Sequence, residues 1–185
     1  MHPKLKSIFF WIMIPLLLSC ASCQIEATSP ATTQFTSYEV KASDIPPGWA
    51  SPGQAWGEDW GGQSHLVGYE ITTPNNVMRL KHMISIYPDE EQAKTAYPKW
   101  EEKWFKGQYV KVTDADFVPS NPNDTYRFEC VPLPSESLFS CNYLQLHKRL
   151  ISFVLVDVDG KSITFAQLNT ILKAVDDRLN KIEVK

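Results

Sequence analysis

The clearest pattern in the chain is an alternation of apolar and polar residues on both sides of a short polar turn. It runs through residues 65–72 and 77–87, with residues 73–76 between them. A period of two is typical of a half-buried β-strand, so this region predicts an antiparallel hairpin. If Thr73 faces Asn76, one side of the hairpin carries the following residues, which we expect to be buried: His65, Val67, Tyr69, Ile71, Met78, Leu80, His82 and Ile84.

A helical pattern follows the hairpin. Asp89, with Gln92 three residues later, forms a capping box that marks the start of a helix, and Gly107 is a natural end. Pro98 lies inside this segment, and a proline removes a backbone donor and disfavours the helical conformation of the residue before it. We therefore expect a kink or two short helices, with these residues on one face: Ala93, Tyr97, Trp100 and Trp104.

The second half of the chain repeats the order of strands followed by a helix. Residues 125–131, 138–147 and 150–158 predict three strands, and the last of these is the longest apolar run after the N-terminal segment. Thr164 and Gln167 form a second capping box. The helix that they begin carries one apolar face, made of Phe165, Leu168, Ile171, Leu172, Val175, Leu179 and Ile182.

About five strands and two amphipathic helices suit an α+β fold. The predicted architecture is a two-layer sandwich, in which both helices cover one face of an antiparallel sheet. The 185 residues, 43% of them hydrophobic and 21% charged, fit one globular domain with a short extra segment. We place this domain at residues 38–185.

The N-terminal segment predicts a cleaved signal peptide over residues 1–19. Lys4 and Lys6 precede an apolar run at residues 8–18, which is too short to cross a hydrocarbon core of about 30 Å as a helix. The run ends in Leu-Leu-Ser-Cys at residues 17–20, which resembles the lipobox of bacterial lipoproteins. That resemblance implies cleavage before Cys20 and attachment of diacylglycerol to its thiol, so that Cys20 becomes a first residue carrying acyl chains such as palmitate and the membrane itself is a partner.

Residues 20–37 would then form the lipidated cysteine and a flexible tether, because residues 21–37 are rich in Ser, Thr, Ala and Pro. The expected location is extracytoplasmic: the outer membrane of a Gram-negative cell, or the outer face of a Gram-positive cell membrane. Three alternatives remain open at this point. Ordinary signal cleavage would leave Cys20 as a thiol, Cys23 could be the modified residue instead, or the segment could stay as an uncleaved anchor, which its short apolar run disfavours.

Charge argues against a nucleic-acid partner. The chain has 18 basic and 21 acidic side chains, a formal net charge of −3, and loss of Lys4 and Lys6 would make it more acidic. No basic stripe and none of the nucleic-acid-binding motifs occur in the sequence.

Cys130 and Cys141 lie on neighbouring predicted strands. An extracytoplasmic location permits oxidation, so we expect a disulfide between them. The alternative is a pair of buried thiols.

The sequence contains no motif for metal binding or catalysis. His65 and His82 are diagonal neighbours in the expected hairpin, but no third ligand accompanies them, so we expect two buried, hydrogen-bonded histidines and neither metal nor cofactor. No Gly-x-Ser-x-Gly occurs, and Ser64 and His65 are adjacent on a strand, where their side chains point to opposite faces.

A tryptophan-rich stretch is the candidate binding loop. Trp49, Trp56 and Trp60 are separated by Gly, Pro, Glu58 and Asp59, and this spacing fits neither one strand nor one helix face. Exposed tryptophans flanked by acids suit a contact with a ligand, a glycan or a protein. The alternative is that these rings fold back and plug the open end of the sandwich.

The element order and the envelope location are similar to those of extracytoplasmic sensor domains carried by some bacterial receptor kinases and lipoproteins. This resemblance implies a non-enzymatic module that binds a small ligand or an envelope protein, and it carries over no site residue. Two other functions remain open: a lipid-anchored hydrolase with a dispersed site formed by Ser64, His65, His82 and Asp59, and a structural or assembly lipoprotein.

Overall fold

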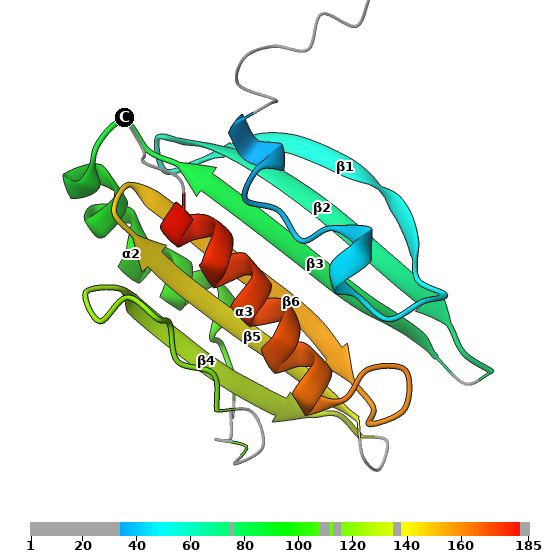
Figure 1. Cartoon of the computed structure of the whole chain (residues 1–185). Coiled ribbons are helices and arrows are strands. Elements are labelled where there is room, and N and C mark those ends of the chain that lie inside the picture. Colours follow the sequence, from blue (N-terminus) through cyan, green and yellow to red (C-terminus); the bar gives the residue numbers. More distant parts are fainter. Residues whose placement is uncertain (1–33, 75, 108–111, 113–115, 135–137, 182–185) are drawn as a thin grey trace, which may run out of the picture.

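The computed structural model describes residues 34–74, 76–107, 112, 116–134 and 138–181, and a six-stranded sheet lies at its centre (Figure 1). All strand pairs are antiparallel, in the order β1-β2-β3-β6-β5-β4. The predicted α+β class with an antiparallel sheet is confirmed, with six strands in place of about five. The strands are β1 (Ala50–Asp59), β2 (Gly62–Thr72), β3 (Val77–Ile86), β4 (Thr125–Pro132), β5 (Phe139–His147) and β6 (Leu150–Val158).

The β2–β3 hairpin has the register that the alternation predicted. Thr72 pairs with Val77, and the backbone N–H of Thr73 donates to the carbonyl of Asn76 over 2.8 Å. His65 pairs with Ile84, which makes it a diagonal neighbour of His82. One face of the hairpin is therefore buried as expected, with His65 and His82 both at 0% exposure.

Two helices begin where the capping boxes predicted. In α2 (Glu90–Trp104) the Asp89 side chain accepts the backbone N–H of Gln92 over 2.8 Å. In α3 (Phe165–Lys181) the N–H of Gln167 donates to Thr164 Oγ1 over 3.2 Å. The expectation of two short helices around Pro98 is wrong, because α2 is one continuous helix.

The continuity of α2 has a packing reason. Tyr97 and Trp100 flank Pro98 and are both buried, so both sides of the proline are held against the sheet. Burial of these two large side chains offsets the backbone hydrogen bond that the proline cannot donate.

The two helices cover opposite faces of the sheet, contrary to the expectation that both lie on one face. Val154 and Val156 of β6 pack in one core with α3, whereas Ile151 and Phe153 pack in a second core with α2. Alternate residues of a strand point to opposite faces, so α3 lies on the front face in Figure 1 and α2 behind it. The long apolar run of β6 explains this, because a strand covered on both faces is apolar throughout.

Two N-terminal segments are ordered in ways that the sequence did not indicate. Residues 50–59, expected to be irregular, form the edge strand β1. Phe35 is 1% exposed and packs in the front core with Tyr38 and Val40, so the packed region begins inside the expected tether of residues 20–37. A short 3-10 helix, η1 (Ala42–Asp44), follows.

The predicted disulfide is confirmed, since Cys130 of β4 and Cys141 of β5 face each other across the two strands and are bonded. The predicted signal peptide, Cys20 and most of the expected tether lie outside the described residues. Within the described part of the chain, no helix combines the length and the apolar character needed to span a bilayer.

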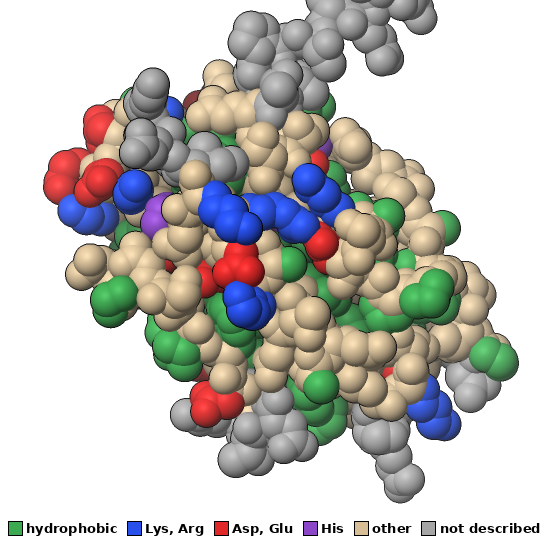
Figure 2. All heavy atoms as spheres, in the orientation of Figure 1, with side chains coloured by type: hydrophobic (Ala, Val, Ile, Leu, Met, Phe, Trp, Pro, Cys, Tyr) green, Lys and Arg blue, Asp and Glu red, His purple; other side chains and the backbone are tan. Residues whose placement is uncertain are grey.

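Charges on the front face are mixed in sign. Arg178 of α3 forms an ion pair with Asp44 over 2.7 Å, and Lys173 pairs with Asp177 over 2.7 Å. Figure 2 shows basic and acidic side chains next to one another over α3. The charges on this face are therefore of both signs.

Candidate functional site

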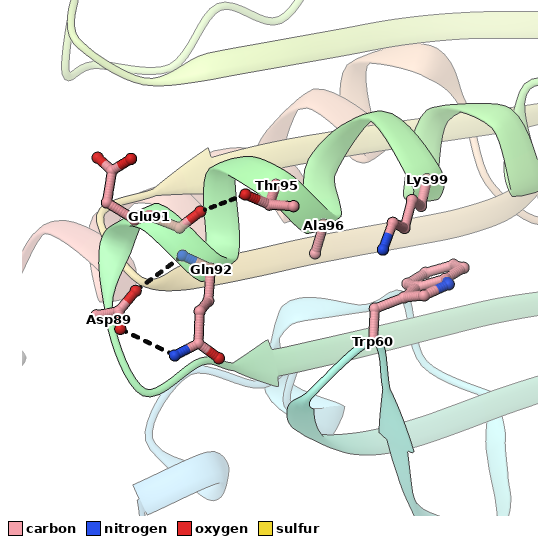
Figure 3. A pocket seen from close by; sticks show the side chains of 7 residues that line it. All are labelled: Trp60, Asp89, Glu91, Gln92, Thr95, Ala96 and Lys99. Atoms are coloured by element: carbon pink, nitrogen blue, oxygen red, sulfur yellow. Dashed lines mark hydrogen bonds between the residues drawn. The ribbon is translucent and has the colours of Figure 1, made fainter.

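A cleft lies between the tip of the β1–β2 hairpin and the first turns of α2 (Figure 3). Its volume is about 250 Å³. One aromatic ring forms the wall on the hairpin side, and polar side chains of the helix form the other wall. The lining residues are Trp60, Asp89, Glu91, Gln92, Thr95, Ala96 and Lys99.

Trp60 occupies the hairpin turn in a fixed position. Its backbone has a φ of 51°, the left-handed region that few residues other than glycine adopt. The ring meets Trp100 of α2 edge-on, with centroids 5.5 Å apart, and Lys103 Nζ lies 5.2 Å from its centroid. The side chain still has 38% of its surface exposed, so it presents a ring held by α2 to the cleft.

Tyr87 connects the tip of the same hairpin to α2. Its hydroxyl donates to the carbonyl of Asp59 over 3.1 Å and accepts the indole N–H of Trp100 over 2.9 Å. Burial raises the pKa of Tyr87 to about 12, so the hydroxyl keeps its proton at neutral pH. Gly62 makes this contact possible, because a Cβ there would lie 2.8 Å from the Tyr87 ring.

The Asp59 side chain adds an ion pair between the hairpin and α2. Its Oδ1 lies 3.3 Å from Lys103 Nζ. Lys103, a residue of α2, therefore contacts both Asp59 and Trp60 of the hairpin, and its ammonium group also lies 5.0 Å from the centroid of the Trp104 ring in the same helix. The hairpin wall of the cleft is thus fixed by α2.

On the helical wall, the N-cap residue Asp89 fixes the position of the Gln92 side chain. The Asp89 carboxylate accepts both the backbone N–H and the side-chain amide of Gln92, and these hydrogen bonds hold the pKa of Asp89 below its usual range. The Thr95 hydroxyl donates to the carbonyl of Glu91 over 2.8 Å. Lys99 points toward Trp60 in Figure 3 and forms no ion pair with any other described residue. The cleft therefore offers an ammonium group and amide atoms opposite an indole ring.

A second hollow of about 470 Å³ lies at the start of α2, and it is lined by Glu90, Lys94, Asn121, Asn123, Asp124, Thr125, Leu146 and Lys148. Asp124 is buried at its wall, and both of its carboxylate oxygens already have partners. It accepts hydrogen bonds from Asn121 and Gln145, and it contacts His147 Nδ1 over 2.9 Å. Because these contacts already occupy the Asp124 carboxylate, the Trp60 cleft is the better candidate site.

The structure separates the residues of the predicted binding loop. Trp49 is half-buried against the front core, and Trp56 lies on the front face of β1, where it stacks on His65 with centroids 3.8 Å apart. Glu58 is exposed near the end of β1, whereas Asp59 and Trp60 contact α2. Only Trp60 of these residues lines the cleft.

The residues that sequence reasoning missed are Gln92, Thr95 and Lys99. They occupy the solvent-facing side of an amphipathic helix, where polar residues are ordinary. The one available signal was that the tryptophan-rich stretch contained an exposed ring, and nothing local indicated which helix the ring would meet.

The histidines are buried and hydrogen-bonded, as expected. His65 Nδ1 is hydrogen-bonded to Glu39 Oε1. His82 Nδ1 accepts the backbone N–H of Val40 over 2.9 Å, and its Nε2 contacts Ser152 Oγ over 3.0 Å. Burial, with a smaller contribution from the Arg178 charge, lowers the pKa of His82 to about 3, so His82 is neutral.

The residues named for a hydrolase site are not brought together. Ser64 lies on the back face and shares a hydrogen bond of 2.6 Å with Ser85, whereas His65 and His82 point into the front core. Asp59 is paired with Lys103. Among the described residues, no group of three or more His, Cys, Asp or Glu side chains is placed to hold a metal ion.

No model of a known protein family matches this chain, and no curated protein matches it. Among solved structures, the chain is similar to the extracellular domain of PknH from Mycobacterium tuberculosis, with a TM-score of 0.55 and 12% sequence identity. The similar region covers 80% of this chain and 95% of that domain. The likeness shows a shared fold, so the resemblance to extracytoplasmic domains is confirmed at the level of the fold.

Proposed function

We propose that this chain is a lipid-anchored, non-enzymatic module of the cell envelope that binds a small polar ligand in the Trp60 cleft. The cleft is the observation that carries the proposal, because it combines a fixed, partly exposed indole with polar side chains. The lipobox-like residues 17–20 support the anchor. The fold shared with an extracellular domain supports the location.

The chemistry of the cleft favours a sugar-like ligand. An indole ring gives a flat apolar surface for the C–H face of a pyranose ring, and Gln92 and Lys99 can hydrogen-bond to its hydroxyls. Pockets for drug-sized ligands are about 300–1,000 Å³, and this cleft is smaller. It therefore suits a single sugar unit, which could be the end of a longer glycan extending into solvent.

Binding is tested by calorimetric titration of the protein with N-acetylglucosamine, glucose and mannose. We expect heat of binding with at least one sugar, its loss in Trp60→Ala, and affinity at least tenfold weaker in Lys99→Ala. Trp56→Ala is the matched control, because Trp56 is more exposed than Trp60 but lies on the opposite face of the sheet. An absence of binding to all three sugars, or equal binding by Trp60→Ala, would contradict the proposal.

The anchor is tested by the intact mass of the protein extracted from membranes. We expect loss of residues 1–19 and an added acyl mass on Cys20, and Cys20→Ala should lack both the acyl mass and membrane association. An unacylated protein with its signal removed would show that the ligand-binding domain is released, and the lipid anchor would be wrong.

A further inference from the structure

We propose that two copies of this chain pair through their β1 strands, antiparallel and centred on Ala55, so that two six-stranded sheets join into one. The proposal goes beyond ligand binding and does not depend on the Trp60 cleft. It starts from a difference between the two edges of the sheet.

The edge strand β4 has features that prevent a strand of another chain from pairing with it. It contains Arg127 and Glu129, which form an ion pair over 3.0 Å, and it ends at Pro132. Charges and prolines on an edge strand prevent other strands from adding to it. This edge is therefore protected.

The edge strand β1 lacks that protection between Gly53 and Gly57, with Pro52 and a register shift at one end and Glu58 and Asp59 at the other. Residues 50–57 contain no charged side chain, and every residue from Ala50 to Glu58 is exposed. Pro52 lies at the irregular start of the strand, where the register with β2 shifts between Ala50 and Gly53. An uncharged, exposed edge of this length is a template for another strand, and a natural protein covers such an edge.

A second copy fits this edge because the middle of β1 is nearly symmetric in residue size. Residues 53–57 read Gly-Gln-Ala-Trp-Gly. With a two-fold axis at Ala55, Gly57 of each copy faces Gly53 of the other, and Trp56 faces Gln54. On the back face the residues that meet are then Gly53, Ala55 and Gly57 of the two copies. Because these residues are small, the two backbones can approach to the ordinary strand spacing of about 4.8 Å.

Charge also permits this arrangement. The only acids of β1 are Glu58 and Asp59, at its C-terminal end. In an antiparallel pair these acids lie at opposite ends of the joined strands, and Glu58 of one copy faces Pro52 of the other. No like charges meet directly across the interface, which would be destabilising.

Trp56 would gain a second contact. The ring stacks on His65 within its own copy and keeps 50% of its surface exposed. Beside Gln54 of the second copy, part of that surface would be removed from water, at about 25 cal/mol per Å² of apolar area.

The chain ends are compatible with pairing on a membrane. A two-fold axis normal to the sheet keeps the front faces of both copies on the same side. Phe35, close to the first described residue, packs on the front face of each copy. Both predicted anchors could thus enter one membrane; this step rests on the proposed function, whereas the strand pairing itself does not.

The test uses full-length chains carrying two different affinity tags, co-expressed and extracted in mild detergent. Wild-type copies should co-purify. Ala55→Lys with itself, and Ala55→Glu with itself, should co-purify at least tenfold less, because like charges would face each other across the axis. Ala55→Lys with Ala55→Glu should restore co-purification. Ala55 is exposed, so neither substitution disturbs the core.

Cross-linking in the membrane gives a second measurement. In a Cys23→Ser parent, Ala55→Cys should form at least tenfold more oxidised dimer than Thr125→Cys, an exposed position on the opposite edge. Equal cross-linking at both edges, or failure of the Lys and Glu variants to restore each other, would overturn the pairing. Sugar binding is not read in either experiment, so the two proposals fail separately.

Discussion

The two halves of the sheet differ in how they are covered. Strands β4, β5 and β6 form the closed half, with α3 on the front face, α2 on the back face and a disulfide between β4 and β5. Strands β1 and β2 form the open half, where β1 is exposed along nearly its whole length. The closed half supplies the large apolar cores, and the open half carries Trp56, Trp60 and the free edge.

The halves also differ in how the front face is held. In the closed half α3 packs on the sheet through the apolar side chains of the front core and through one buried hydrogen bond, from Gln145 of β5 to Asp176 over 2.8 Å. In the open half the N-terminal segment is held by polar groups: Arg178 donates to the carbonyl of Glu39 over 2.8 Å, and Val40 donates to His82. Protonation of His82 should therefore weaken the attachment of the N-terminal segment, because a protonated ring nitrogen cannot accept the Val40 N–H.

The largest effect is expected in the core under α2. Trp100→Ala should lower the free energy of unfolding by about 3–5 kcal/mol, because it removes a fully buried ring and the hydrogen bond to Tyr87. Urea unfolding measures the change. Trp56→Ala, the control in the open half, should cost about 1 kcal/mol or less, since its ring is half exposed. Equal losses in the two variants would remove the energetic difference between the halves.

Loss of the disulfide should cause the second-largest decrease in stability. Replacing Cys130 and Cys141 together by alanine removes a crosslink with a sequence separation of 11, which is worth about 3 kcal/mol in the chain-entropy model. Thermal unfolding with and without reductant checks the value, and the double variant should no longer respond to reductant. A wild-type protein insensitive to reductant would show that the crosslink contributes nothing to stability.

Acid should weaken the open half. The pKa of His82 falls from 6.5 to about 3 on folding, so the unfolded chain binds more protons between these values. Stability from this group is present above pH 6.5 and declines as the pH falls toward 3, by up to about 1.4 kcal/mol per pH unit. Urea unfolding between pH 7 and pH 5 measures the slope.

The control for this titration is His82→Asn. An asparagine retains an acceptor for the Val40 N–H and does not titrate. Its stability should change less with pH than that of the wild type. The same slope in both proteins would assign the pH dependence to another titratable group.

The smallest expected effect is an increase in stability. Gly57→Ala on β1 should stabilise the protein by about 0.4–1 kcal/mol, because an added Cβ meets no atom within 4 Å and the unfolded chain loses freedom. Gly62→Ala is the matched control with the opposite sign, since its Cβ would lie 2.8 Å from the Tyr87 ring. Thermal unfolding measures both variants. A loss of stability in both would show that a side chain at Gly57 is not tolerated.

Much of the fold could be predicted because its signals are local. The alternation around Thr73 and Asn76 defined the register of the β2–β3 hairpin, and the two capping boxes marked the starts of α2 and α3. β1 could not be predicted, because Ser, Pro, Gly and Gln dominate a strand that is exposed on both faces and so has no apolar period. Of the two outcomes expected at Pro98, a kink or two short helices, the second is wrong, because the cost of the proline to the helix is offset by packing that lies outside the helix.

The candidate site was only partly predictable. Trp60 was identified from its neighbours in the sequence, but Gln92 and Lys99 joined it only when α2 folded against the hairpin. The sequence by itself determined the strand alternation, the helix starts and the pairing of Cys130 with Cys141, because these depend on residues close along the chain or on adjacent strands. Tertiary structure alone decided that α2 and α3 cover opposite faces and that Trp60 meets α2. Those contacts depend on how distant elements pack, and a residue pattern specifies which face is apolar without specifying what will cover it.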